Sequence, residues 1–137
     1  MITAVDTNIL IDILEPDPIH GPTSQDLLRR AFREGSVVAC EVVWAEVATA
    51  YDDQLEMVVS ALDELSIGFS PMTQAAALKA AVCWSAFRRK YGKKGRIVAD
   101  FLIGGHALIQ CDRLLTRDRG FFRDYFQPLV LLTLPEL

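Results

Sequence analysis

The chain has 137 residues, a length that suits a single domain spanning residues 1–137. Hydrophobic residues make up 51% of the chain and charged residues 23%, a balance that suits a buried core and argues against intrinsic disorder. The net charge of −4 gives no general basic signature of nucleic-acid binding. The charge is unevenly distributed, because one short stretch without an acid contains Arg88, Arg89, Lys90, Lys93, Lys94 and Arg96.

In chain order, the first half is expected to form a strand at 2–5, a helix at 9–14, a helix capped by Thr23 or Ser24 and ending at Glu34, a strand at 37–39, and helices at 41–51 and 54–65. The second half is expected to form a weak strand at 67–69, a helix from a Thr73 cap to Tyr91, a loop at 92–95, a helix at 98–110, and strands at 114–116 and 129–133.

This alternation of strands and helices predicts an α/β fold, a three-layer α/β/α sandwich around a mainly parallel sheet. Ligands of such sheets bind outside the carboxyl ends of the strands. Asp6 directly follows the first strand, and Asp118 comes just after the strand at 114–116. We therefore expect both acids at the same edge of the sheet.

Two further acids, Glu46 and Asp100, lie on predicted helices among apolar residues. Side chains three and four positions apart share a helix face, and for both acids these neighbours are mainly apolar. Both carboxylates are therefore expected to point toward the core or the rim of a pocket. Asp12 has a mixed face and is expected to be solvated or peripheral. Ordinary surface positions are expected for Asp26, Glu34, Asp52, Asp53, Asp63 and Glu64.

Four carboxylates close together would repel one another unless some were protonated or a cation neutralised them. An all-oxygen ligand set without paired histidine or cysteine suits Mg²⁺ or Mn²⁺ rather than zinc. Such ions activate water and brace phosphoryl oxygens, so the pattern indicates hydrolysis of a phosphodiester. Taken singly, Asp6 or Asp118 is more often a helix cap or turn residue, and Glu46 is as readily a salt-bridge or interface residue.

The order and spacing of four motifs resemble a PIN-domain ribonuclease, and most closely the VapC toxins of type II toxin–antitoxin pairs. The motifs are Val5-Asp6-Thr7-Asn8-Ile9-Leu10, Ala45-Glu46-Val47, the run from Ala99 to Leu108, and the run from Leu115 to Phe122. The resemblance covers nearly the whole chain. The first motif alone is a weak signal, whereas all four at these spacings are specific.

The resemblance implies an α/β/α sandwich with an Mg²⁺- or Mn²⁺-dependent endoribonuclease site. It implies that Asp6 and Asp100 are metal ligands, and that Glu46 and Asp118 complete the acidic site directly or through water. Asn8 and Thr116 would be the polar groups that hold these carboxylates. It also implies an RNA substrate, a VapB-like antitoxin partner that covers the acidic site, and a homodimer that assembles into a larger toxin–antitoxin complex.

The basic stretch before Asp100 is either a solvated helix end or a surface that holds RNA phosphates beside the acids. The possible phosphate contacts are Arg89, Lys93, Lys94, Arg96 and Arg117. Arg117 and Arg119 flank Asp118 and would either reach phosphate or pair with acids. His106 is expected in the core or an interface rather than as a catalytic base.

Gly104-Gly105 stands where the family usually has small residues such as alanine. The two glycines either permit close helix packing or are simply tolerated.

Two other functions remain open at this point. A Mg²⁺-dependent phosphatase with an aspartyl nucleophile would want a second aspartate two residues after Asp6, where this chain has Asn8. A non-catalytic module would use its acids only to dock a basic partner, without metal-dependent turnover.

Compartment signals are few. Cys40, Cys83 and Cys111 are odd in number and far apart, so neither a zinc site nor a disulfide framework is indicated. Core cysteines in a reducing cytoplasm fit this pattern. We predict no signal peptide and no membrane association, because no apolar run approaches the roughly 20 residues needed to span a bilayer.

Overall fold

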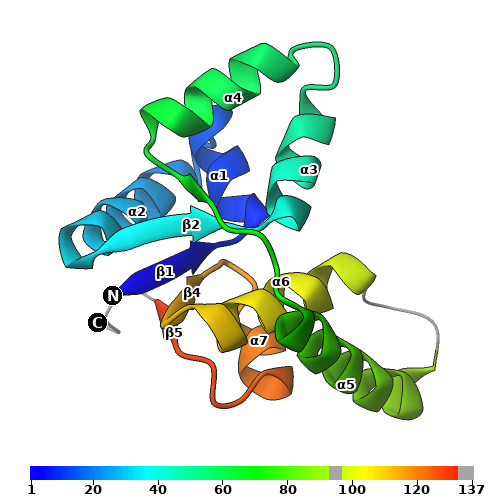
Figure 1. Cartoon of the computed structure of the whole chain (residues 1–137). Coiled ribbons are helices and arrows are strands. Elements are labelled where there is room, and N and C mark those ends of the chain that lie inside the picture. Colours follow the sequence, from blue (N-terminus) through cyan, green and yellow to red (C-terminus); the bar gives the residue numbers. More distant parts are fainter. Residues whose placement is uncertain (93–96, 133–137) are drawn as a thin grey trace.

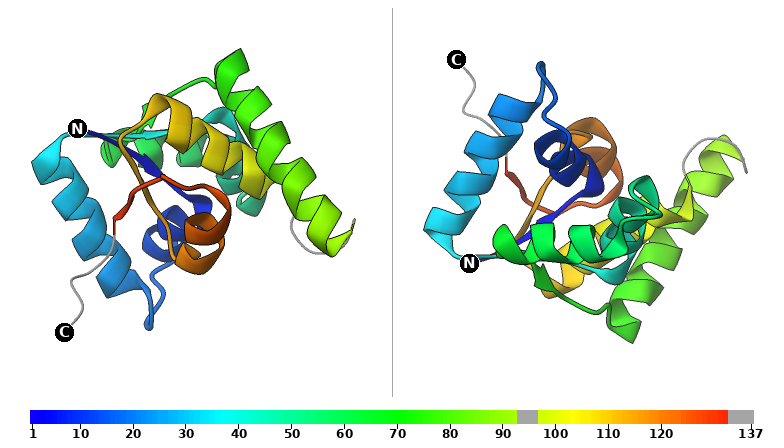
Figure 2. Two further views of the ribbon diagram at one scale, coloured as in Figure 1. Left: turned by 90° about the horizontal axis from the view of Figure 1, so that it is seen from below. Right: turned by 90° about the horizontal axis from the view of Figure 1, so that it is seen from above.

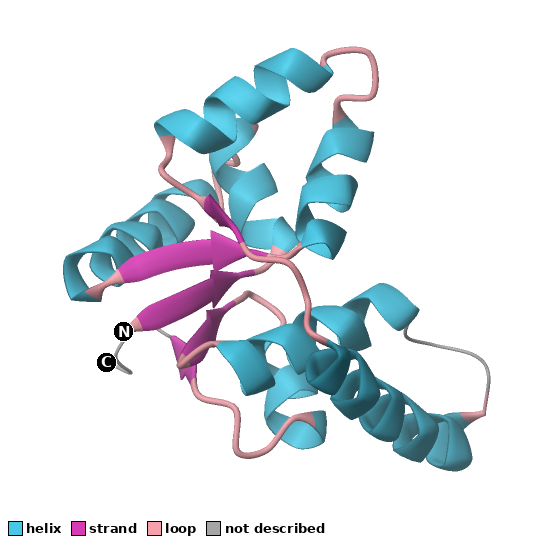
Figure 3. Cartoon of the chain, in the orientation of Figure 1, coloured by secondary structure: helices cyan, strands magenta, loops and turns pink. Residues whose placement is uncertain are grey.

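The computed structural model describes residues 1–92 and 97–132. Its centre is a five-stranded sheet in the order β3-β2-β1-β4-β5 (Figure 1). Every neighbouring pair is parallel, and the arrowheads in Figure 3 point to the same edge. The strands are β1 (Ile2–Val5), β2 (Ser36–Ala39), β3 (Gly68–Phe69), β4 (Arg113–Leu115) and β5 (Leu131–Leu132). The expected parallel α/β sheet is confirmed. Strand β5 is shorter than the strand predicted at 129–133, and residue 133 lies outside the described residues.

Helices cover both faces of the sheet, as expected for a three-layer sandwich. They are α1 (Thr7–Leu14), α2 (Gly21–Glu34), α3 (Glu41–Ala50), α4 (Leu55–Glu64), α5 (Gln74–Tyr91), α6 (Val98–Gln110) and α7 (Arg119–Tyr125). Helices α1 to α4 form one layer, since α1 contacts α2 and α3, and α3 contacts α4. Helices α5 to α7 form the other layer, in which α5 and α6 lie side by side (Figure 2) and Phe121 of α7 contacts Phe87 and Phe101. In the part of the chain described, no helix is long and apolar enough to cross a membrane.

Most helix boundaries match the predictions, and the exceptions have local causes. Helix α1 begins two residues early because the Asp6 carboxylate accepts the Thr7 N–H at 2.7 Å and caps it. Helix α2 begins at Gly21 without a side-chain cap, continuing a turn in which the Gly21 N–H bonds the Asp17 carbonyl. The Thr73 hydroxyl caps α5 as predicted, accepting the Ala76 N–H at 3.2 Å.

Helix α7 is the one helix of the described chain that the sequence did not predict. Its seven residues are dominated by aromatic and polar side chains rather than strong helix formers. Packing stabilises it instead, because Phe121 and Phe122 are buried and contact the aromatic cluster of Phe87, Phe101 and Phe126. The loop expected at 92–95 lies outside the described residues except for Gly92.

His106 belongs to this buried core, which confirms the expectation for its place. Its side chain is 1% exposed, and its Nε2 lies 2.9 Å from the Ser70 hydroxyl. Burial lowers the pKa of its imidazole, so the neutral ring is favoured. Cys40 and Cys83 are also buried, Cys111 is half-buried, and all three thiols are free.

The glycine pair permits close packing, which decides between the two alternatives. A Cβ on Gly105 would lie 2.6 Å from the Ala76 carbonyl oxygen and 3.0 Å from the Ala80 Cβ. A Cβ on Gly104 would lie 2.5 Å from the Phe126 ring. Helix α6 therefore approaches α5 and Phe126 more closely than any side chain allows, and the low helix propensity of glycine is the cost of that contact.

Gly105→Ala is expected to destabilise the fold although alanine is the better helix former. Overpacking costs about 1–3 kcal/mol and the propensity gain is about 1 kcal/mol, so a net loss of up to about 2 kcal/mol is expected. Urea denaturation measures it. Gly120→Ala in α7 is the control, because its new methyl would meet only the Arg123 side chain at 3.7 Å. Equal stability of the two variants would contradict the packing role.

Candidate acidic active site

The carboxyl ends of β1 and β4 lie side by side and place the first acid. Val5 pairs with Leu115 in the parallel register of the two strands. The Asp6 N–H then continues the pairing by donating to the Leu115 carbonyl at 2.9 Å. Asp6 and Thr116, each one residue past its strand, are therefore neighbours although 110 positions separate them. The predicted meeting of these two strand ends is seen in the structure.

Asp6 is nearly enclosed, and both of its carboxylate oxygens are engaged. One oxygen accepts the Thr7 N–H, and the other accepts the Thr116 hydroxyl at 2.7 Å. Only 7% of the residue is exposed. Burial raises the pKa of the Asp6 carboxyl to about 6, against the lowering effect of these two hydrogen bonds, and Asp100 and Glu46 raise it further.

The electrostatic effect of Glu46 and Asp100 on Asp6 shows that helices α3 and α6 bring both acids to this edge. Glu46 is half-buried, and its carboxylate accepts the Thr7 hydroxyl at 2.7 Å. Thr7 thus links Glu46 to the segment that carries Asp6. Asp100 is half-buried in the first turn of α6. The structure therefore gathers three of the four predicted acids into one electrostatically coupled group.

Asp118 joins the site through its backbone. The Thr116 hydroxyl donates to Asp6 and also accepts the Asp118 N–H at 3.0 Å. Asp118 precedes α7 and is half-buried. Thr116 itself is 2% exposed, and its hydroxyl holds the Asp6 carboxylate. The Asn8 side chain instead accepts the Arg117 N–H at 3.3 Å, so in this structure it holds the loop that leads to Asp118 and not a carboxylate.

Asp12 is not solvated or peripheral, and that expectation was wrong. Its side chain is 3% exposed and accepts two hydrogen bonds from the Arg117 guanidinium, at 2.7 and 3.0 Å. The Ser24 hydroxyl donates to the same carboxylate at 2.8 Å. The mixed helix face of Asp12 packs under the 116–118 loop and α2, both distant in sequence. Helix periodicity alone could not reveal these partners.

The predicted phosphate contacts are spread over two parts of the chain. Arg89 is exposed near the end of α5. Lys93, Lys94 and Arg96 lie outside the described residues. Arg117 is paired with Asp12 and its side chain is 40% exposed. A role for these cations in RNA binding remains a prediction.

The acids do not form a closed cage. Within residues 1–92 and 97–132, no three histidine, cysteine, aspartate or glutamate side chains are grouped so as to hold one ion by themselves. The side-chain atoms near Asp6 that could bind a metal ion are nevertheless all oxygens, from carboxylates and from the Thr7 and Thr116 hydroxyls. Sequence reasoning missed Thr7, although its place directly after Asp6 on the first turn of a helix was a usable signal.

The fold and the site together describe an α/β domain with a parallel sheet and a group of acidic residues at the carboxyl ends of its strands. Residues 3–126 match the PIN domain family. The chain therefore belongs to the PIN-domain family, as the motifs suggested. The comparison with curated protein sequences found no match.

Solved structures share the fold at low sequence identity. The complex VapBC2 from Rickettsia felis, bound to a promoter DNA fragment, contains a chain that is 20% identical, with a TM-score of 0.75 over 96% of this chain and 97% of that one. VapBC-1 from nontypeable Haemophilus influenzae gives 19% identity and a TM-score of 0.71 over 96% of both chains. FitAcB from Neisseria gonorrhoeae gives 22% identity and a TM-score of 0.68 over 97% of both chains.

Proposed function

We propose that this PIN-domain protein is a metal-dependent endoribonuclease that acts in the cytoplasm as the toxin of a type II toxin–antitoxin pair. The observation that carries the proposal is the buried Asp6 carboxylate with Glu46 and Asp100 within electrostatic reach. Burying like charges together is costly unless they serve a function or bind a cation. Family membership supports a nuclease, because PIN domains are in general nucleases.

The donors present fit Mg²⁺ or Mn²⁺. Burial, and to a smaller degree the charges of Asp100 and Glu46, raise the pKa of Asp6, and a divalent cation would offset both effects on the carboxylate. Mg²⁺ keeps several waters and often binds through only one or two carboxylates, so an open arrangement of acids suits it. Asp6 and Asp100 would hold the ion, with Glu46 and Asp118 completing the site directly or through water.

The protein side chains would then orient the reaction. A bound Mg²⁺ or Mn²⁺ supplies an activated water and neutralises charge on the phosphoryl group. Thr116 fixes the Asp6 carboxylate and the start of the Asp118 turn, and Thr7 fixes Glu46. Above pH 6 Asp6 is mostly ionised and able to ligate, so activity is expected to fall as the pH drops through that value.

An antitoxin partner follows from the structural relatives. The similar chains come from VapBC and FitAcB complexes, and the Rickettsia felis complex was solved on promoter DNA. By analogy, a VapB-like antitoxin would cover the acidic edge of this chain, and a homodimer of the toxin would assemble with it into a larger complex.

Cleavage of RNA by the purified chain tests the nuclease. Cleavage is expected with Mg²⁺ or Mn²⁺, and chelation or Asp100→Asn is expected to reduce it at least about 100-fold, since the acid acts in the transition state. Asp26→Asn is the matched control, because Asp26 forms only an exposed pair with Arg29. Cleavage that survives both chelation and Asp100→Asn would overturn the mechanism. Absence of cleavage with either ion would favour the non-catalytic acidic module.

A further inference from the structure

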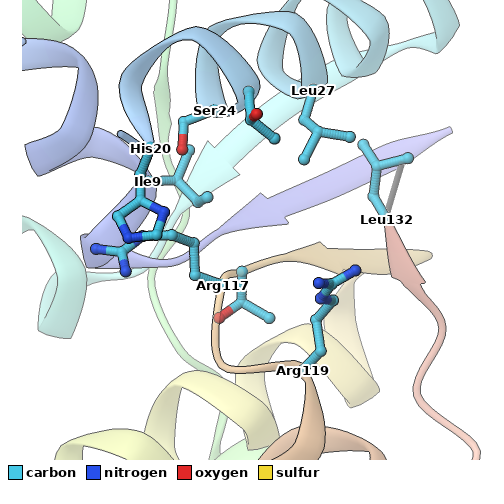
Figure 4. Close-up of a pocket in the computed structure, with 9 residues that line it drawn as sticks. Ile9, His20, Ser24, Leu27, Arg117, Arg119 and Leu132 are labelled. Carbon is cyan, nitrogen blue, oxygen red and sulfur yellow. The ribbon is translucent and has the colours of Figure 1, made fainter. Parts of the chain in front are cut away.

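A second concave site lies beside the acidic edge, between α1, α2, α7 and β5. Its volume is about 270 Å³, and Figure 4 shows the side chains around it. It is lined by Ile9, His20, Thr23, Ser24, Leu27, Thr116, Arg117, Arg119 and Leu132. The volume is slightly below the roughly 300–1,000 Å³ of pockets for drug-sized ligands, so one small organic group would fill it.

The pocket is cationic in a chain that is acidic as a whole. No aspartate or glutamate lines it. Arg117 is paired with Asp12, whereas Arg119 has no acidic partner within residues 1–92 and 97–132. In Figure 4 the Arg119 side chain extends from α7 into the pocket, between Leu132 and the loop that carries Arg117. A guanidinium at a pocket wall suits a phosphate group.

Three of the residues that line the pocket are apolar. Ile9, Leu27 and Leu132 are all buried and come from three separate elements, so their positions are fixed by the core. The exposed Thr23 hydroxyl stands at the rim as a polar group. An apolar wall beside a guanidinium matches a ligand with both a flat ring and an anionic group.

The pocket is directly connected to the acidic site. Thr116 lines the pocket, and its hydroxyl donates to the Asp6 carboxylate at 2.7 Å. Arg119 follows Asp118 in the chain, so one short segment contributes to both sites. The pocket and the acidic site therefore share Thr116 and the segment that follows it.

We propose that this pocket is a nucleotide subsite, which binds one nucleotide of the RNA next to the cleaved bond. The base lies on Ile9, Leu27 and Leu132, and the phosphate of that nucleotide meets the Arg119 guanidinium. This proposal rests on the proposed RNA cleavage. It identifies the pocket as the place where the nuclease selects its substrate. Since the polar groups at the rim can distinguish base edges, the pocket is expected to prefer some bases over others.

Binding of mononucleotides tests the pocket without cleavage. Adenosine, guanosine, cytidine and uridine monophosphates are titrated in turn into the wild-type chain in EDTA, with methyl NMR signals as the readout. At least one of them is expected to shift the methyl signals of Ile9, Leu27 and Leu132. Inorganic phosphate is expected to perturb the Arg119 Nε–H signal, recorded on the same samples, and to leave the three methyl signals unmoved. Methyl signals that stay unmoved by all four nucleotides would overturn the proposal.

Two variants and their matched controls locate the binding. Arg119→Ala is expected to weaken nucleotide binding about tenfold, the usual effect of losing one charge-assisted contact. Arg123→Ala on the same helix is the control, since Arg123 pairs with Asp124 on the surface. Thr23→Glu is expected to repel the phosphate and weaken binding, whereas Thr23→Gln of similar size is not. Equal binding by Arg119→Ala and Arg123→Ala would place the phosphate elsewhere.

Cleavage of short RNAs separates this proposal from the proposed function. Arg119→Ala is expected to raise KM about tenfold and to flatten the preference for the base next to the cut, with kcat little changed. Failure of the wild-type chain to cut RNA while nucleotides still shift the pocket methyls would refute the nuclease alone. RNA cleavage with unchanged KM and base preference in Arg119→Ala would refute the subsite alone.

Discussion

Asp6→Asn is expected to abolish RNA cleavage and at the same time to stabilise the fold. The amide cannot carry the charge that would hold Mg²⁺ or Mn²⁺, so a loss of at least about 1,000-fold in kcat is expected. The stability gain has a different cause, because burial, and to a smaller degree the charges of Asp100 and Glu46, disfavour the ionised Asp6 carboxylate in the folded state. Function and stability therefore oppose each other at this position.

The raised pKa of Asp6 determines whether the free energy of unfolding rises or falls with pH. The pKa of Asp6 is about 6 in the folded chain against an ordinary value of 3.8, so the folded state binds more protons than the unfolded state between these values. Without metal, the contribution of Asp6 to the wild-type free energy of unfolding should therefore fall by up to about 3 kcal/mol as the pH rises from about 4 to 7. Asp6→Asn lacks this contribution.

Denaturation in EDTA at several pH values measures the effect. Asn loses the acceptor for the Thr116 hydroxyl, which costs about 1 kcal/mol, so a net gain of about 1–2 kcal/mol is expected at pH 7. Added Mg²⁺ should stabilise the wild type and leave Asp6→Asn unchanged. An Asp6→Asn variant that is less stable than the wild type at pH 7, or that responds equally to Mg²⁺, would contradict the assignment.

Asp12→Ala is expected to cause the largest loss of stability among the acidic positions. Removing one partner of a buried pair costs about 3–5 kcal/mol, and water reaching the 40% exposed Arg117 side chain should reduce this to about 2–4 kcal/mol. The loop from Thr116 to Asp118 also loses its anchor on α1, so cleavage should fall as well. Urea denaturation and the RNA assay measure the two effects.

The exposed pair Asp26–Arg29 offers a matched control. Its side chains are 68% and 67% exposed, and Asp26→Ala should change the free energy of unfolding by no more than about 0.5 kcal/mol. A double-mutant cycle of Asp12→Ala and Arg117→Ala should give a coupling of about 1–3 kcal/mol. If Asp12→Ala were as mild as Asp26→Ala, the ion pair would have no structural role.

The sequence by itself determined the parallel α/β fold and the position of the acidic edge. The alternation of strands and helices, and the position of Asp6 directly after a strand, depend on residues that are neighbours in the sequence, so both can be predicted from the sequence. The apolar faces of Glu46 and Asp100 likewise indicated that both acids turn inward, and the structure brings both to Asp6. The motifs then gave the family, which the match over residues 3–126 confirms.

Only the tertiary structure decided which partners the polar side chains find. Asp12 looked solvated because its own helix shows a mixed face, yet Arg117 meets it from 105 positions away. Helix α7 forms because its phenylalanines are buried against residues from other elements, not because of its propensity. The pocket of Arg119 likewise combines α1, α2, α7 and β5. Contacts between distant segments depend on how the layers pack, and periodicity within one segment contains no information about them.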